Sequence, residues 1–314
     1  MITLYVTIPC YNEEEVLPIT VNAMEKKMQS LLQQGRISPQ SRVVFIDDGS
    51  KDKTWELISK FHEENPLFSG IKLSRNRGHQ NALLCGLMTV KDYADAVISI
   101  DADLQDDIEV FDEMLDKYEA GCDVVYGVRG SRETDTFFKR FTAEAYYKIL
   151  NKMGAKVIFN HADYRLMSKR ALEGLAEFKE VNLFLRGIVP MIGYKSDTVT
   201  YERAERAAGE SKYPLKKMLA LAFEGITSLS IRPIRFVSWL GAAAFGVSII
   251  MLIVFLVEYF LGKTVEGWAT IVVSLWALGG LQLLAIGVIG EYVGKLYLEA
   301  KERPRFIVEE FFNE

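Results

Sequence analysis

The sequence has few of the residues that mark disulfide-rich and zinc-binding proteins. Among its 314 residues there are three cysteines, Cys10, Cys85 and Cys122, and no Cys-x-x-Cys pair. The three histidines do not stand at spacings typical of zinc ligands. A small, odd number of cysteines argues against a disulfide framework and is typical of a reducing compartment.

Basic residues are also too few for a general nucleic-acid-binding protein. The chain has 37 Lys and Arg against 42 Asp and Glu, a formal net charge of −5. Its first nine residues lack the basic segment and long apolar run of a secretory signal. With 49% hydrophobic and 25% charged residues, the composition is that of a folded protein rather than a disordered one.

Charge is nearly absent from two long segments near the C-terminus. Residues 236–261 contain one ionisable side chain, Glu258, and residues 268–289 contain none. Each run meets the requirement of about 20 apolar residues for a helix that crosses a bilayer. The alternative is a pair of buried core helices, but soluble helices of this length usually have a polar face. We therefore predict a hairpin of two transmembrane helices, at about 236–261 and 268–290.

The basic residues around these runs predict the orientation of the hairpin. The short connection contains only Lys263, whereas six basic residues flank the outer ends: Arg232, Arg235, Lys295, Lys301, Arg303 and Arg305. By the positive-inside rule, both termini lie in the cytoplasm and the chain is a multi-pass plasma-membrane protein. Residues 213–235 are predicted to form amphipathic juxtamembrane helices, with an ordinary surface helix as the alternative.

Residues 295–314 are predicted to form a cytoplasmic tail. The segment 305–312 alternates apolar and polar residues, which is typical of a strand. We expect this strand to pair with a neighbouring copy, so that the tail and the hairpin would support a homo-oligomer.

The first 212 residues are predicted to form one cytoplasmic α/β domain. Apolar segments and helical periodicities alternate along the chain, which favours a mainly parallel sheet covered by helices. Neither G-x-G-x-x-G nor G-x-x-x-x-G-K-[ST] occurs, so the fingerprints of a dinucleotide site and a P-loop are missing. The expected strands are 4–9, 42–46, 70–73, 96–100 and 123–127, and the expected helices are 14–34, 54–64, 79–90 and 108–120.

Polar clusters follow several of these strands, at the edge where ligands of such sheets bind. The clearest is Asp101-Ala-Asp103, two carboxylates directly after an apolar strand. Carboxylates are the ligands that Mg²⁺ and Mn²⁺ prefer, and these cations bridge readily to a diphosphate. Gln105 could complete the ligand set or have a neutral role in the turn.

Three motifs in this order resemble the family 2 glycosyltransferases of GT-A fold: Ile8-Pro-Cys-Tyr-Asn-Glu-Glu14, Asp47-Asp-Gly-Ser-Lys-Asp-Lys-Thr54 and Asp101-Ala-Asp-Leu-Gln-Asp106. Later segments resemble the polyprenyl-phosphate branch, in particular the bactoprenol (undecaprenyl-phosphate) glucosyltransferases, and more distantly dolichol-phosphate mannose synthase. These segments are Val125-Tyr-Gly-Val-Arg129, Asp163-Tyr-Arg-Leu-Met167, Phe184-Leu-Arg-Gly187 and Gly209-Glu-Ser-Lys-Tyr213. The QxxRW motif of processive family 2 synthases is absent.

The resemblance implies a UDP-sugar donor and assigns residues to it. Pro9, Tyr11 and Glu14 would line the nucleoside pocket, and Asp48 would accept a hydrogen bond from the base. Asp47 and Asp48 could instead cap the following helix. Asp101 and Asp103, with Gln105, would hold Mg²⁺ or Mn²⁺ on the diphosphate, where the metal stabilises the leaving UDP.

The acceptor implied by the resemblance is a polyprenyl phosphate. Its phosphate is mostly ionised at neutral pH, so it needs a cationic clamp more than a general base. The candidates, each of which could also be a plain surface charge, are Arg129, Arg132, Arg203, Arg206 and Lys212. Asp163 occupies the position of the family's active-site carboxylate and could act as a base, orient an arginine such as Arg165, or form a structural salt bridge.

The resemblance therefore implies an inverting transferase that moves glucose or N-acetylglucosamine from UDP to undecaprenyl phosphate on the cytoplasmic membrane face. Its lipid product would serve modification of cell-surface glycans. Two alternatives stay open at this point: a transferase with a lipid hydroxyl acceptor, and a non-catalytic membrane scaffold.

Overall fold

The computed structural model describes residues 1–130, 161–181, 184–202, 232–261 and 267–312. The chain divides into two compact units. The first comprises Met1–Ala220 together with Arg303–Glu314, and the second comprises Leu221–Glu302. The last residues of the chain therefore belong to the same unit as the first.

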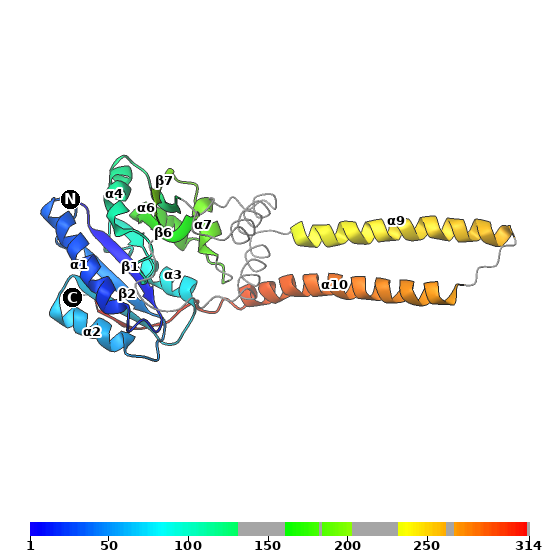
Figure 1. The fold of residues 1–314 in the computed structure, drawn as a ribbon, viewed down its shortest axis with the longest axis horizontal. Coiled ribbons are helices and arrows are strands. Elements are labelled where there is room, and N and C mark those ends of the chain that lie inside the picture. Colours follow the sequence, from blue (N-terminus) through cyan, green and yellow to red (C-terminus); the bar gives the residue numbers. More distant parts are fainter. Residues whose placement is uncertain (131–160, 182–183, 203–231, 262–266, 313–314) are drawn as a thin grey trace. The chain divides into compact units, whose positions relative to one another are not determined.

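The first unit is built on one eight-stranded sheet with the order β7-β5-β6-β4-β1-β2-β3-β8 (Figure 1). β6 and β8 run antiparallel to their neighbours, and the other pairings are parallel, so the sheet is mainly parallel, as predicted. The strands are β1 (Leu4–Cys10), β2 (Arg42–Asp47), β3 (Phe68–Leu73), β4 (Ala96–Ser99), β5 (Val124–Arg129), β6 (His161–Ser168), β7 (Ser196–Tyr201) and β8 (Val308–Phe311).

Helices cover both faces of this sheet. Alternate residues of each central strand point to opposite faces: Val6 and Phe45 enter one buried cluster, and Tyr5 and Val44 enter the other. The first cluster is completed by α1 (Leu17–Gln33), α2 (Thr54–Glu64) and α4 (Phe111–Glu119). The second is completed by α3 (His79–Val90), α6 (Lys169–Ala176) and α7 (Leu185–Met191). The predicted α/β architecture, a mainly parallel sheet covered by helices, is confirmed.

The reversed strand β6 decides what lies at the carboxyl edge of the sheet. It pairs antiparallel with β4, so that Ser99 is opposite Arg165, and it pairs antiparallel with β5, so that Val128 is opposite His161. Because β6 runs the other way, its first residues lie beside the last residues of β4. Asp163 is thereby placed next to the segment that continues into Asp101.

The C-terminal tail forms the predicted strand, but its partner is within the chain. β8 pairs antiparallel with β3, with Ile71 opposite Phe311 and Lys72 opposite Glu310. The ring of Phe312 stacks on Trp55 and on His62, with centroids 5.0 and 4.9 Å apart. The expectation that this strand pairs with a neighbouring copy is wrong, because the edge of β3 is already occupied by the strand from the same chain.

The second unit contains two long helices, α9 (Arg232–Phe260) and α10 (Trp268–Ala300), which contact each other and run antiparallel (Figure 1). Two helices are therefore present where the hairpin was predicted, and the prediction that both cross a membrane stays a prediction. α10 continues ten residues beyond the predicted end at 290. Among the described residues, one stretch, Ala277–Ala300, is long and apolar enough to cross a membrane. The predicted helices between 213 and 231 lie outside the described residues.

Candidate functional site

The loop that follows β4 carries the two aspartates of the predicted cation site, and we call residues 101–106 the DxD loop. Asp101 is 40% exposed and Asp103 is half-buried, so both carboxylates can reach solvent. The intervening Ala102 is buried, and its carbonyl accepts a hydrogen bond from the Thr20 hydroxyl at 2.7 Å. Leu104 has a φ of 51°, which turns the chain back sharply after Asp103.

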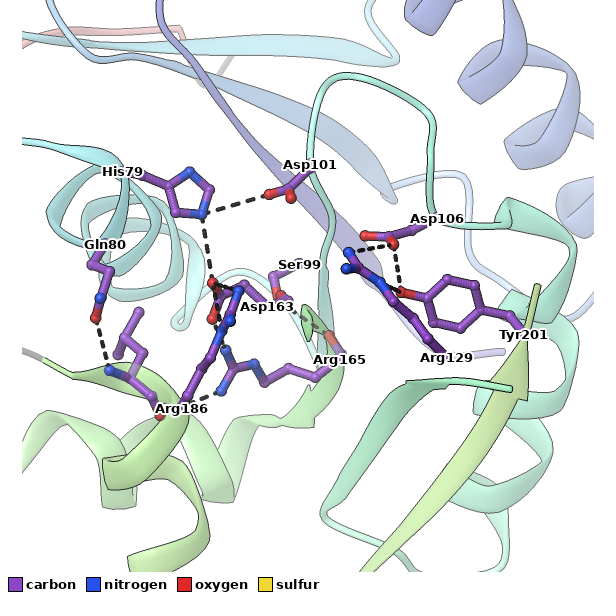
Figure 2. Close-up of polar contacts among 11 residues, drawn as sticks. His79, Gln80, Ser99, Asp101, Asp106, Arg129, Asp163, Arg165, Arg186 and Tyr201 are labelled. Carbon is purple, nitrogen blue, oxygen red and sulfur yellow. Dashed lines mark hydrogen bonds and ion pairs between the residues drawn. The ribbon is translucent and has the colours of Figure 1, made fainter. Parts of the chain in front are cut away.

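The far end of the DxD loop is held by a buried aspartate. Asp106 is 2% exposed, and it accepts a hydrogen bond from the Tyr201 hydroxyl and one from Arg129 Nη2 at 3.4 Å. Arg129 Nε also donates to the Tyr201 oxygen at 3.3 Å, which closes a three-membered network (Figure 2). Burial, together with the charge of Asp101, raises the pKa of Asp106. The network ties the loop to the ends of β5 and β7.

A second network surrounds Asp163, which is only 7% exposed. Its Oδ1 accepts a hydrogen bond from Arg165 Nη2 at 2.6 Å. Its Oδ2 accepts from Arg186 Nη2 at 2.9 Å and from Arg186 Nε at 3.2 Å (Figure 2). The pairing with Arg165 that the sequence analysis considered is present, and a second arginine has been added to it.

The two arginines have different surroundings. Arg165 is 1% exposed, and its Nη1 lies 3.5 Å from the Leu185 carbonyl oxygen. Arg186 is 36% exposed and projects from α7, whose neighbouring residues Leu185 and Ile188 are buried in the core. Burial acts to raise the pKa of Asp163, but the charges of Arg186 and Arg165 outweigh it and hold that pKa well below its usual range. Asp163 is therefore a stable carboxylate and a weak proton acceptor.

His79 joins the Asp163 network to the DxD loop. It is the first residue of α3, and its Nε2 lies 3.5 Å from Asp101 Oδ1 and 3.8 Å from Asp163 Oδ2 (Figure 2). The next residue, Gln80, accepts a hydrogen bond from the Leu185 backbone N–H at 2.9 Å. The start of α3 thus connects the loop after β4 with the start of α7.

The residues predicted for the nucleoside pocket lie at or just after the ends of β1 and β2, at the same edge of the sheet. Pro9 is buried within β1, and Tyr11 is exposed. Glu14 Oε2 accepts a hydrogen bond from the Lys53 backbone N–H at 3.0 Å, which ties the β1–α1 loop to the start of α2. Asp47 accepts from the Ser50 backbone N–H at 3.1 Å, a local turn contact. The alternative that this pair caps the following helix is wrong, because the N-cap of α2 is Lys53 and no side chain caps it.

Asp48 holds the loop in front of α3. Its Oδ1 and Oδ2 accept hydrogen bonds from the backbone N–H groups of Arg77 and Gly78, at 2.6 and 2.9 Å. Burial raises its pKa, and these hydrogen bonds oppose the rise. Gly49 allows this close approach: it has a φ of 67°, and a Cβ there would lie 2.6 Å from the backbone nitrogen of Asn76. A role of Asp48 in binding a base stays a prediction.

Four of the five predicted phosphate-clamp residues lie outside the described residues: Arg132, Arg203, Arg206 and Lys212. The fifth, Arg129, is tied to Asp106 and Tyr201 as described above. Sequence reasoning passed over His79 and Arg186 as site residues. A signal for His79 was available, because it opens a helix just after a strand of the sheet. Arg186 lies in the quoted motif Phe184-Leu-Arg-Gly187, but the sequence did not reveal that α7 packs beside β6 and brings Arg186 to Asp163.

Comparison with known proteins assigns the chain to a family. Residues 5–175 match the model of the family described as glycosyl transferase family 2. The chain belongs to this family. It is 52% identical over 312 residues to "Uncharacterized glycosyltransferase YkoT" of Bacillus subtilis (strain 168), which covers 99% of this chain and 93% of the relative. The enzyme is thus a glycosyltransferase, and the matched segment contains both the DxD loop and Asp163.

Other relatives have more specific names. The chain is 40% identical over 306 residues to "Bactoprenol glucosyl transferase" of Shigella phage SfV, with 96% of each chain covered. Among solved structures, glucosyl-3-phosphoglycerate synthase from Mycobacterium tuberculosis is 19% identical, with a TM-score of 0.43 over 73% of this chain and 78% of the other.

Proposed function

We propose that this glycosyltransferase moves a sugar from a UDP-sugar to a polyprenyl phosphate, undecaprenyl phosphate in a bacterium, at the cytoplasmic face of the plasma membrane. The donor sugar is glucose or N-acetylglucosamine. The product is a polyprenyl-phosphate-sugar that serves modification of cell-surface glycans. Similarity to a bactoprenol glucosyl transferase over nearly the full length of both chains supports this proposal, as does the apolar stretch Ala277–Ala300.

The observation that carries the choice of acceptor is the pairing of Asp163 with two arginines. A hydroxyl acceptor has to lose its proton as it attacks, so it needs a general base within reach. Asp163 is the buried carboxylate beside the DxD loop, and Arg165 and Arg186 make it a weak base. A phosphate acceptor is mostly ionised at neutral pH and can attack without that help. The Asp163 geometry therefore favours a phosphate over a lipid hydroxyl.

The oxygen ligands that the DxD loop offers fit a divalent cation that is bound together with the diphosphate of the UDP-sugar. Among the described residues, no group of three His, Cys, Asp or Glu side chains is arranged to hold a metal ion by itself. Mg²⁺ usually binds through one or two carboxylates and takes its other ligands from phosphates and water. Asp101 and Asp103 would hold the cation, with Gln105 nearby, and it would stabilise the charge on the departing UDP.

The remaining residues have roles in orientation. The Asp106–Tyr201–Arg129 network holds the DxD loop in place, and His79 contacts Asp101 from the opposite side. Arg129, with Arg132, Arg203, Arg206 and Lys212, would clamp the acceptor phosphate, because guanidinium groups match phosphate oxygens. Attack by the phosphate in line with the departing UDP would invert the anomeric centre.

Transfer with purified enzyme tests the proposal. The protein in detergent is incubated with undecaprenyl phosphate, Mg²⁺ and a panel of UDP-sugars, and the lipid product is identified by mass spectrometry. We expect one sugar to be transferred, and transfer to be lost with a chelator and in Asp103→Asn. Asp92→Asn, a change at an exposed residue after α3, is the matched control and should retain activity. Transfer to a prenol or diacylglycerol but not to the phosphate would contradict the proposed acceptor.

A further inference from the structure

The C-terminal tail is bound to the first unit from Arg305 onward. Arg305 Nη1 donates a hydrogen bond to the Phe178 carbonyl oxygen at 3.0 Å, and Phe306 packs against the second buried cluster. The Ile307 carbonyl oxygen accepts a hydrogen bond from the Ser74 backbone N–H at 3.0 Å, just before β8 begins. The tail is therefore held by contacts on both sides of the point where it enters the sheet.

The end of the tail contacts the helices on both faces of the sheet. Successive residues of a strand point to opposite faces. Phe311 packs against the second buried cluster, whereas the ring of Phe312 stacks on Trp55 of α2. Gly70 leaves room for that ring, because a Cβ there would lie 3.2 Å from Phe312 Cδ2. The Phe312 backbone N–H also donates to the Gly70 carbonyl oxygen at 2.9 Å, so apolar burial and hydrogen bonding both hold the tail.

The direction of β8 places its first residue at the carboxyl edge of the sheet. β8 runs antiparallel to β3, and Val308 is opposite Leu73, the last residue of β3. The DxD loop follows β4 at the same edge, because β3, β2, β1 and β4 are successive parallel neighbours. The tail therefore enters the first unit at the edge that carries the proposed site.

The connection between α10 and the bound part of the tail is short. α10 ends at Ala300, and residues 301–304 separate it from Arg305. The peptide steps from Ala300 to Arg305 can span at most about 18 Å. The other connection between the two units is much longer, because residues 202–231 lie between β7 and α9. Of the two connections, the tail is the one that restricts the carboxyl edge most.

We infer that residues 301–312 form a strap, which holds the carboxyl edge of the first unit close to the membrane end of α10 and so within reach of a lipid acceptor. This inference rests on the proposed function and on the predicted crossing of the membrane by α10. A polyprenyl acceptor stays in the bilayer, so transfer to it depends on how closely the site is held to the membrane surface. The effective concentration of a tethered site falls roughly as the −3/2 power of the tether length. The strap acts on transfer to the lipid and has no part in binding the donor.

Insertions that lengthen the strap test the inference. Flexible inserts of about five and about twenty Gly and Ser residues are placed between Glu302 and Arg303 of the full chain. They leave the contacts of the tail in place. The matched control has the longer insert after Glu314, where it lengthens the chain but not the connection to α10.

Each protein is reconstituted in phosphatidylglycerol vesicles that contain undecaprenyl phosphate. Transfer is measured with Mg²⁺ and with UDP-glucose and UDP-N-acetylglucosamine in turn. The apparent Tm and the affinity for UDP with Mg²⁺ are measured on the same proteins, and they report the fold and donor binding independently of the lipid.

We expect the longer insert to lower the rate of transfer about tenfold and the shorter insert about threefold, because both lengthen a connection of a few residues several-fold or about twofold. The Tm and the UDP affinity should stay at their wild-type values, and the control should transfer like the wild type. Equal transfer by all the proteins would overturn the inference and leave the proposed function standing. A loss of transfer that is matched by a loss of UDP affinity, or that the control shares, would also overturn it.

The wild type keeps the inference apart from the proposed function. If the wild type transfers no sugar to undecaprenyl phosphate, the proposed function is overturned, and the inference with it. Should the longer insert prevent folding, transfer at the wild-type rate by the variant with the shorter insert would overturn the inference alone.

Discussion

The hydroxyl of Tyr201, the last residue of β7, donates a hydrogen bond to the buried carboxylate of Asp106 at the end of the DxD loop. Ninety-five positions separate the two residues in the sequence. The contact joins the loop of the proposed cation site to the strand that leads into Arg203 and Arg206. The same hydroxyl accepts a hydrogen bond from Arg129, so one tyrosine connects three parts of the proposed site.

Removing that hydroxyl should loosen the DxD loop. In Tyr201→Phe, Asp106 stays buried and loses a donor, which costs about 1–3 kcal/mol of unfolding free energy. We expect a lower apparent Tm in detergent and a higher Mg²⁺ requirement for transfer. Tyr118→Phe is the control, because its hydroxyl donates to an exposed carbonyl, that of Asp95, at 3.3 Å. Equal losses in both variants would show that the Tyr201–Asp106 bond has no special role.

The low pKa of Asp163 predicts a pH-dependent stability. A carboxyl whose pKa is depressed on folding stabilises the protein above its ordinary pKa of about 3.9, and this contribution is lost as the pH falls toward the folded-state value. Near neutral pH, Asp163→Asn should lower the free energy of unfolding by about 3 kcal/mol, because Arg165 and Arg186 lose their counterion. Apparent Tm values of both proteins are compared between pH 7 and pH 3.

The difference in Tm between wild type and Asp163→Asn should narrow below about pH 4, where Asp163 of the unfolded chain begins to take up a proton that the folded protein does not yet bind. Asp92→Asn, at an exposed position, serves as the control and should give a small difference at every pH. A large Tm difference that is the same at pH 7 and pH 3 would mean that the charge of Asp163 is not what stabilises the fold.

The proposed cation site predicts metal binding that depends on the donor nucleotide. Because two carboxylates supply only part of a ligand set, Mn²⁺ should bind weakly alone and more tightly with UDP present. Asp103→Asn should weaken Mn²⁺ binding with UDP by roughly tenfold or more. The electron paramagnetic resonance signal of free Mn²⁺, followed during a titration, measures the Mn²⁺ affinity of each protein. An Mn²⁺ affinity that is unchanged in Asp103→Asn would place the cation elsewhere.

The pairing of β8 with β3 predicts which parts of the chain share a compartment. Two strands of one sheet must lie on the same side of a membrane, so the chain between them crosses it an even number of times. The native cysteines are buried, which permits labelling of single introduced cysteines with a membrane-impermeant maleimide. Asp92→Cys and Glu309→Cys should both be labelled only in inside-out vesicles, and Lys263→Cys only from outside.

Labelling of Asp92→Cys and Glu309→Cys from opposite sides would contradict the pairing of β8 with β3 in the membrane-bound protein. Labelling of all three positions from the same side would leave that pairing intact. It would, however, rule out the transmembrane hairpin, because residue 263 would not have crossed the bilayer.

The amino-acid sequence by itself determined the local elements of the first 130 residues and the two long apolar helices. Strands such as 42–46 and helices such as 79–90 were predictable because their hydrophobic periodicity is a property of neighbouring residues. The sequence also placed Asp101 and Asp103 directly after a strand, and the parallel order of the strands was enough to assign them to the carboxyl edge of the sheet.

Only the tertiary structure decided which residues meet at that edge. The reversal of β6 brings Asp163 beside the DxD loop, the packing of α7 brings Arg186 to Asp163, and β8 closes the sheet against β3 rather than against another copy. These contacts join residues far apart in the chain, and no local periodicity encodes them. They arise because burying the apolar faces of helices and strands fixes the order and direction of the strands, and the polar groups are carried into place with them.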